Sequence, residues 1–169
     1  MNKKIFQLQN SLRIKFDNIK LLEQSLIHKS YSSDYNNEKL EFLGDRVLGL
    51  ILSQKLLEIY PEEKEGIIDK KFANLVNKKI CAKIGEKIKI KEYMTLGDSN
   101  RNLKRSDVKI ISDALEALIG AIYLDKGIKF AEKFILNYWK VYLDQSNVTL
   151  IDPKTKLQEY SLKKYKELP

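Results

Sequence analysis

Cysteine and histidine are almost absent from this chain of 169 residues. Cys81 is the only cysteine, so the chain cannot form an internal disulfide, which fits a reducing compartment. His28 is the only histidine, which excludes zinc sites built from several histidines. A Cys–His or Ser–His catalytic pair stays open, although a lone histidine is more often structural.

Long apolar runs are also missing. No stretch approaches the roughly 20 apolar residues that a membrane-spanning helix needs. The N-terminus mixes apolar with polar residues too early to resemble a signal peptide. We therefore expect a cytoplasmic protein without a membrane partner.

Positive charge, in contrast, is present in excess. Lysine and arginine number 31 against 23 aspartate and glutamate residues, giving a formal net charge of +8. Such a surplus favours a polyanionic partner, either nucleic acid or an acidic membrane surface. A lysine-rich composition that follows from genome composition would look the same, so charge alone leaves the partner open.

The apolar residues recur at helical spacing, and with only 7 glycines and 3 prolines the sequence predicts an all-α bundle of roughly six to eight helices. Asn18 is a candidate N-cap for the first stripe, and Pro61 ends the longest helix. The segment from Met94 to Asp107 reads as a loop. The expected helices cover residues 19–26, 37–60, 72–85, 115–126 and 130–141.

Three acids share one face of the expected helix over 37–60. Glu38, Glu41 and Asp45 stand at i, i+3 and i+7, within about 60° of one another. The residues four positions after them are Phe42, Asp45 and Gly49, so no lysine relieves the repulsion. An uncompensated acidic face on a basic protein suggests that a bound cation neutralises it.

A second acidic pair, Asp113 and Glu116, stands at i and i+3 in another apolar helix, where Lys109 can pair with Asp113. Gly120 continues this face and leaves room for a close approach. If the two helices pack together, Glu41, Asp45, Asp113 and Glu116 can converge on magnesium, whereas Glu38 lies roughly 10 Å along the axis from Asp45. Exposed acids on amphipathic helices are the alternative.

Three longer stretches of the sequence resemble motifs of a known family. Residues 37–48 resemble the signature of the ribonuclease III family, residues 113–125 resemble its second catalytic block, and residues 25–31 resemble an early element. The resemblance covers about residues 5–145. It implies a homodimeric bundle of the ribonuclease III endonuclease-domain type.

The resemblance also implies an activity. Such enzymes cleave double-stranded RNA by phosphodiester hydrolysis with Mg²⁺, for which Mn²⁺ can substitute, and leave 5′-phosphate and 3′-hydroxyl ends with short 3′ overhangs. Glu41, Asp45, Asp113 and Glu116 match the metal-binding acids, with Asp45 and Glu116 as catalytic residues. Precursors of ribosomal RNA and messenger RNAs are the expected substrates. Relatives that have lost cleavage and act as RNA-binding scaffolds provide the alternative.

Further residues receive roles from the resemblance alone. Glu38 and Glu65 match acids that position substrate or water, and Phe42 matches an aromatic that fills a pocket of the partner subunit. An ordinary core phenylalanine is the alternative for Phe42. Departures from the family pattern include Arg46 in place of a small residue, Asp69 and Phe72 in place of serine and arginine, and a glycine-free stretch over 100–106.

The C-terminal residues suggest the beginning of a second module. We expect an endonuclease domain over 1–147, a linker over 148–152, and over 153–169 the first helix of a truncated double-stranded-RNA-binding domain. By resemblance, Thr155 and Gln158 would face the RNA minor groove, since such domains read the shape of A-form RNA. A solvated lysine-rich helix is the alternative, and a naturally short enzyme remains an alternative to a truncated one.

Overall fold

Helices make up most of the described chain, which comprises residues 3–98, 107–146, 161 and 164–166 of a computed structural model. These residues contain no strand, only an isolated parallel bridge between Ile27 and Thr95. The all-α prediction is therefore confirmed. The helices are α1 (Lys3–Leu12), α2 (Ile19–Ser25), α3 (Glu38–Ile59), α4 (Glu65–Leu75), α5 (Lys78–Lys87), the 3₁₀ helix η1 (Ile90–Tyr93), α6 (Asp107–Lys126) and α7 (Ile128–Gln145).

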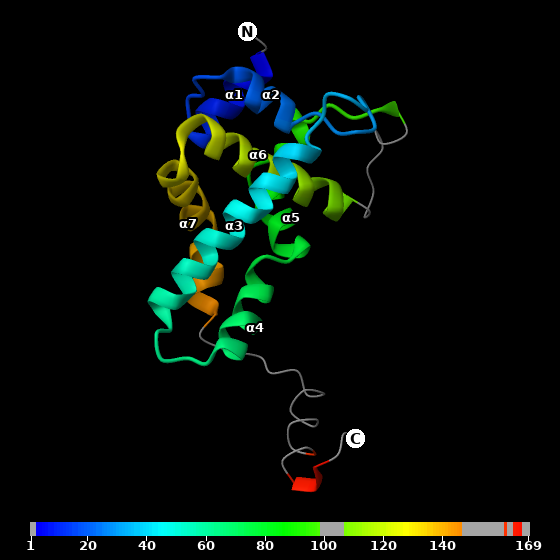
Figure 1. The fold of residues 1–169 in the computed structure, drawn as a ribbon. Helices are drawn as coiled ribbons and strands as arrows, with labels where there is room; N and C mark the ends of the chain where they lie inside the picture. Colours follow the sequence, from blue (N-terminus) through cyan, green and yellow to red (C-terminus); the bar gives the residue numbers. More distant parts are fainter. Residues whose placement is uncertain (1–2, 99–106, 147–160, 162–163, 167–169) are drawn as a thin grey trace.

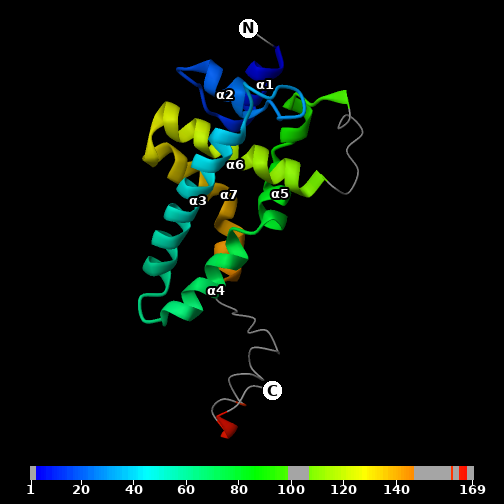
Figure 2. The same cartoon turned by 45° about the vertical axis from the view of Figure 1, so that its right-hand side comes forward.

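Helix α6 lies at the centre of the bundle (Figures 1 and 2). All residues from 111 to 122 are buried, because apolar and small side chains occur on every side of this segment. Helix α3 crosses α6, and α2, α5 and α7 pack against it from other sides. Two acids in the middle of α6, Asp113 and Glu116, are consequently carried into the interior.

The crossing of α3 and α6 depends on two glycines. A Cβ on Gly44 would overlap the backbone of Glu116, and a Cβ on Gly120 would overlap the backbone of Leu40. Only residues without side chains allow the two backbones to come this close. The approach predicted at Gly120 is present, and it brings the first turns of α3 against the middle of α6.

The predicted helix boundaries hold in part. Helix α3 spans the predicted long helix, and the side chain of Asn18 caps α2 by accepting a hydrogen bond from the backbone N–H of Lys20. The single helix expected over 72–85 is wrong, because the chain bends between α4 and α5. There the side chain of Asn77 accepts a hydrogen bond from the backbone N–H of Ile80, which starts α5. The sequence-based prediction also did not single out α1.

None of the described helices is both long and apolar enough to cross a bilayer. Of the predicted RNA-binding helix over 153–169, only residues 161 and 164–166 belong to the described part of the chain. Thr155 and Gln158 lie outside the described residues, so the roles expected for them stay predictions.

Candidate active site

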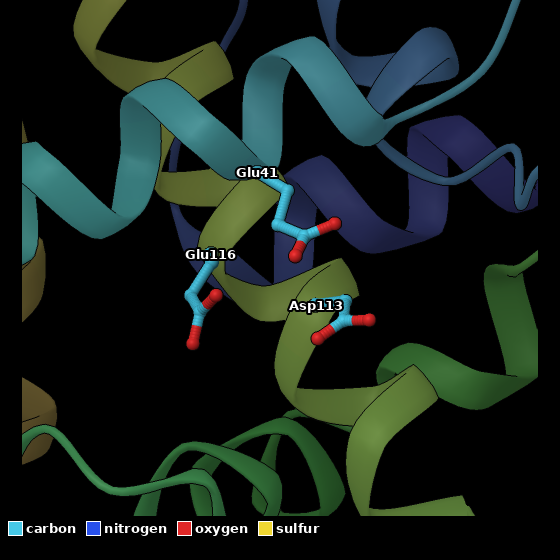
Figure 3. A group of neighbouring side chains, drawn as sticks. All are labelled: Glu41, Asp113 and Glu116. Carbon is cyan, nitrogen blue, oxygen red and sulfur yellow. The ribbon is translucent and has the colours of Figure 1, made fainter.

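Three of the predicted acids converge where α3 crosses α6. Glu41 comes from the first turn of α3, and Asp113 and Glu116 come from α6, one turn apart (Figure 3). One carboxylate oxygen from each lies within 4.8 Å of the others. The close crossing at Gly44 explains this approach, since Glu41 lies less than one turn before it on α3.

Two of the three acids are buried. The exposed fraction is 5% for Asp113 and 8% for Glu116, while Glu41 is half-buried. A groove of about 460 Å³ opens beside them, and Glu41 and Glu116 contribute to its lining. The remaining lining residues are Glu38, Phe42, Asp45, Arg46, Val76 and Lys78. The acids are thus withdrawn from bulk water, and the groove gives access to Glu41 and Glu116.

Burial and mutual repulsion disfavour negative charge in this cluster. Burial raises the pKa of Glu116 to about 7, and the charges of Asp45, Asp113 and Glu41 act in the same direction. Burial, and then the charge of Asp113, raises the pKa of Glu41. The protein therefore does not supply enough positive charge to neutralise its own acids, as expected of a site that takes up a cation.

Asp113 has one satisfied and one unsatisfied oxygen. Its Oδ2 accepts a hydrogen bond from Nζ of Lys109 at 2.5 Å, the pairing that the sequence allowed. Its Oδ1 is buried and has no hydrogen-bond partner among the described residues. A buried carboxylate oxygen without a partner is costly unless something occupies the place beside it.

These three acids fit a hard divalent cation. Mg²⁺ prefers oxygen ligands, and bonds of about 2.1 Å place its ligand oxygens roughly 3–4 Å apart. The three carboxylates could therefore reach one ion with small side-chain adjustments from their separation of at most 4.8 Å. The unsatisfied oxygen of Asp113 adds a ligand atom that no protein group uses.

Asp45 is not part of the three-acid cluster. It lines the same groove, but its side chain is 44% exposed and forms an ion pair with Arg46. The guanidinium of Arg46 also lies over the ring of Phe42, 4.7 Å from its centroid. Arg46, a departure from the family pattern, thus contacts an acid of the groove.

The two acids that were expected to position substrate or water lie in different places. Glu38 lines the groove and forms an ion pair of 2.8 Å with Lys29, whose hydrogen bond lowers the pKa of Glu38. The repulsion that the sequence left unrelieved is therefore relieved here by a lysine from the loop before α3. Glu65 begins α4, near the end of α3 opposite Glu41, and does not line the groove (Figure 1).

For Phe42 and His28, the structure can be compared with the alternatives that the sequence left open. Phe42 has an exposed fraction of 65%, so it is not an ordinary core residue of the single chain. The ring of His28 pairs with Ser30, since its Nδ1 lies 2.8 Å from the Ser30 hydroxyl and accepts from the Ser30 N–H at 3.1 Å. The sole histidine therefore supports a turn.

Sequence reasoning missed neighbours of the acids on other turns and helices. Ser112 donates a hydrogen bond to Glu116, and Lys78 of α5 lines the groove. Ser112 stands four residues before Glu116, a spacing that makes the contact possible on a helix. The approach of Lys78 depends on how α5 packs, which spacing does not reveal.

Residues 18–142 match the sequence model of a family described as Ribonuclease-III-like. The chain belongs to the ribonuclease III family. Ribonuclease 3 of Pelagibacter ubique is 57% identical over 164 residues, which cover 96% of this chain and 73% of that protein. Ribonuclease 3 of Leptospira interrogans is 37% identical over 171 residues, covering 96% of this chain and 69% of that protein. The chain is thus an endoribonuclease of this family.

Solved structures agree with this assignment. Two structures of the nuclease domain of ribonuclease III from Campylobacter jejuni are 37% identical to this chain, with TM-scores of 0.77 and 0.76. The first match covers 83% of this chain and 99% of that domain, and the second covers 90% and 100%. One of them is described as showing structural flexibility in a region involved in dimer formation.

Proposed function

We propose that this ribonuclease III family endonuclease cleaves double-stranded RNA with Mg²⁺, or Mn²⁺ in its place, held by Glu41, Asp113 and Glu116. The observation that carries this proposal is the convergence of these carboxylates within 4.8 Å, together with the buried, unpartnered Oδ1 of Asp113. When bound, Mg²⁺ supplies the Lewis acidity that activates water and stabilises the leaving oxygen in phosphodiester hydrolysis.

Asp45 completes the proposed acid set as the fourth ligand and a catalytic residue beside Glu116. It lines the groove next to the three-acid cluster, and its charge is among the causes that raise the pKa of Glu116. In this proposal the carboxylate of Asp45, which is paired with Arg46, would help to hold the cation. Arg46 could then contact a phosphate of the RNA, because its largely exposed side chain lines the same groove.

The residues around the groove suit a polyanionic substrate. Lys78 lines the groove, and the formal net charge of the chain is +8. Glu38 lines the groove with a half-exposed side chain, from which it can position substrate or water. We infer that binding to the RNA depends strongly on salt, because lysine-rich surfaces release counterions from phosphates. Assays should therefore begin at low salt.

The proposed active form is a homodimer. Phe42 is exposed beside the groove, where it can enter a pocket of a second copy. Glu65 does not line this groove within one subunit, and we infer that it acts at the groove of a partner subunit. Two sites that cut opposite strands would leave short 3′ overhangs, with 5′-phosphate and 3′-hydroxyl ends.

We place this activity in the cytoplasm, in the processing of ribosomal RNA precursors and messenger RNAs. Residues 153–169 would add the first helix of a double-stranded-RNA-binding domain, with Thr155 and Gln158 at the minor groove. The enzymes named Ribonuclease 3 extend beyond the matched region, since the chain covers 73% of the Pelagibacter ubique protein. A longer form is the natural comparison in binding experiments.

The decisive experiment separates cleavage from RNA binding. Glu116→Gln removes a charge from the cluster and should abolish cleavage of a long RNA duplex while sparing binding at low salt. Glu58→Gln is the matched control, because Glu58 lies near the far end of α3, where it pairs with Lys55 at 2.8 Å. Retained cleavage by the Glu116 variant would refute the site. Intact RNA binding without cleavage by the unmodified protein would favour a scaffold.

A further inference from the structure

Ser112 lies directly behind the acidic cluster, one residue before Asp113. Its side chain is completely buried, and its hydroxyl donates a hydrogen bond of 3.0 Å to Oε1 of Glu116, four residues later on α6. This hydrogen bond joins two side chains about one turn apart on the same helix. A serine hydroxyl has one hydrogen to donate, and here it is committed to a proposed metal ligand.

Three other serines in or beside helices of this chain behave differently. The hydroxyls of Ser11, Ser25 and Ser146 donate to backbone carbonyls three residues earlier, at 2.8, 2.7 and 2.6 Å. Such local bonds to the backbone are the usual behaviour of serine in and near helices. Ser112 instead directs its hydrogen forward to a side chain, so its role is tied to that of Glu116.

The surroundings of this pair are closed to solvent. Cys81 of α5 is completely buried and lies near both residues, because Ser112 and Glu116 are both among the groups that shift the pKa of its thiol. Burial raises that pKa to about 12, so the thiol stays protonated and inert. With Ser112 and Cys81 both inaccessible to solvent, water could not easily replace a missing hydroxyl.

Glutamate needs such a restraint more than aspartate does. Its carboxylate stands beyond several rotatable bonds, so a fixed orientation costs conformational entropy. Groups that hydrogen-bond to a metal ligand orient that ligand before the ion arrives, and their loss typically weakens metal binding about 10–100-fold. Ser112 has the burial, the distance and the donor to act in this way on Glu116.

We propose that Ser112 is a positioning residue, whose hydroxyl holds the Glu116 carboxylate in the orientation that binds the divalent cation. This inference rests on the metal site proposed above. Ser112 acts through Glu116 and does not touch the substrate. Its loss therefore weakens metal binding in the absence of RNA, lowers cleavage at limiting metal, and leaves the KM for RNA at saturating metal unchanged.

The test is calorimetric titration of Mn²⁺ into the RNA-free protein. Ser112→Ala should raise the Kd for Mn²⁺ about 10-fold or more. Ser25→Ala is the matched control, because Ser25 is equally buried and helical but donates to the carbonyl of Leu22. It should change the Kd less than about 2-fold. Ser112→Thr, which retains a hydroxyl, should restore most of the affinity, and thermal unfolding would check that each variant folds.

Each contrary result has a distinct meaning. A Ser112→Ala protein that folds and binds Mn²⁺ as the unmodified protein does would overturn the role of Ser112 and leave the metal site standing. Equal weakening by Ser25→Ala would also overturn it, because the effect would then be a general loss of stability. If the unmodified protein binds no Mn²⁺, the proposed metal site fails and this inference fails with it.

Discussion

Nζ of Lys109 lies 2.5 Å from Oδ2 of Asp113, so a largely exposed lysine neutralises the most buried acid of the cluster. The positive charge of Lys109 also acts on Glu41, where it partly offsets the rise in pKa that burial and Asp113 cause. The pKa of Lys109 is itself raised, chiefly by the hydrogen bond to Asp113. In the metal-free protein, Lys109 therefore supplies part of the charge that a cation would supply.

Replacing Lys109 with glutamine should strengthen cation binding. A nearby positive charge repels a divalent cation, but its exposure weakens the effect, so we expect the Kd for Mn²⁺ to fall about 2–10-fold at low ionic strength. Calorimetry on the RNA-free protein measures this. Lys83→Gln, an exposed lysine on α5 outside the groove, is the control for net charge. Weaker binding by the Lys109 variant would mean that the lysine supports the site.

The raised pKa of Glu116 should make the stability of the metal-free protein depend on pH. The ordinary pKa of this carboxyl is 4.5, and the fold raises it to about 7, so the folded state holds more protons between these values. Stability from this group is present at low pH and is lost as pH rises through about 7. The loss is on the order of 1–3 kcal/mol.

Comparison with Glu116→Gln isolates this effect from other titrating groups. The variant carries no charge at this position, so its stability advantage over the unmodified protein should grow from pH 5 to pH 8. Urea unfolding in the presence of a chelator measures both proteins. Saturating Mg²⁺ should reduce the advantage at pH 8. An advantage that shrinks with rising pH would contradict the assignment of the pKa of about 7 to Glu116.

The glycine crossing should be intolerant of any side chain. Gly44→Ala would place a Cβ in overlap with the backbone of Glu116, which no change of rotamer can relieve. We expect a loss of at least about 2–3 kcal/mol in the free energy of unfolding. Gly66→Ala is the control, since a Cβ there meets no atom within 4 Å. Equal stability of the two variants would show that α3 and α6 do not cross as described.

Phe42 should contribute to self-association. Its exposed fraction of 65% is unusual for a phenylalanine, and it lies beside the groove. Phe42→Ser should raise the dimer dissociation constant about 10-fold or more in sedimentation equilibrium. Phe6→Ser removes another half-exposed phenylalanine, on α1, and should leave the constant unchanged. If both variants associate like the unmodified protein, Phe42 does not belong to the interface.

Periodicity revealed most of the fold but not its bends. Apolar residues mark α3 clearly, so it was predicted within one residue at each end, whereas the helix expected over 115–126 reaches the end of α6 but misses its start at Asp107. The apolar stripe continues through Phe72, Val76 and Ile80, which made α4 and α5 look like one helix. The break follows from the capping hydrogen bond of Asn77, which competes locally with a continuous helix.

The acids of the site could be predicted from spacing, but their partners could not. Glu41, Asp113 and Glu116 lie on helices that two glycines allow to approach, and they converge. The contact of Glu38 with Lys29 joins α3 to the preceding loop, so helical spacing gave no sign of it. Asp45 faces its neighbour Arg46, an arrangement that depends on side-chain rotamers.

The most direct test is a cleavage assay on a long RNA duplex at low salt. The unmodified protein is incubated with Mg²⁺, with Ca²⁺, or with a chelator, and the product ends are analysed. The account predicts cleavage with Mg²⁺ and none with Ca²⁺ or the chelator, giving short duplexes with 5′-phosphates. Equal cleavage in the presence of the chelator would contradict a metal held by Glu41, Asp113 and Glu116.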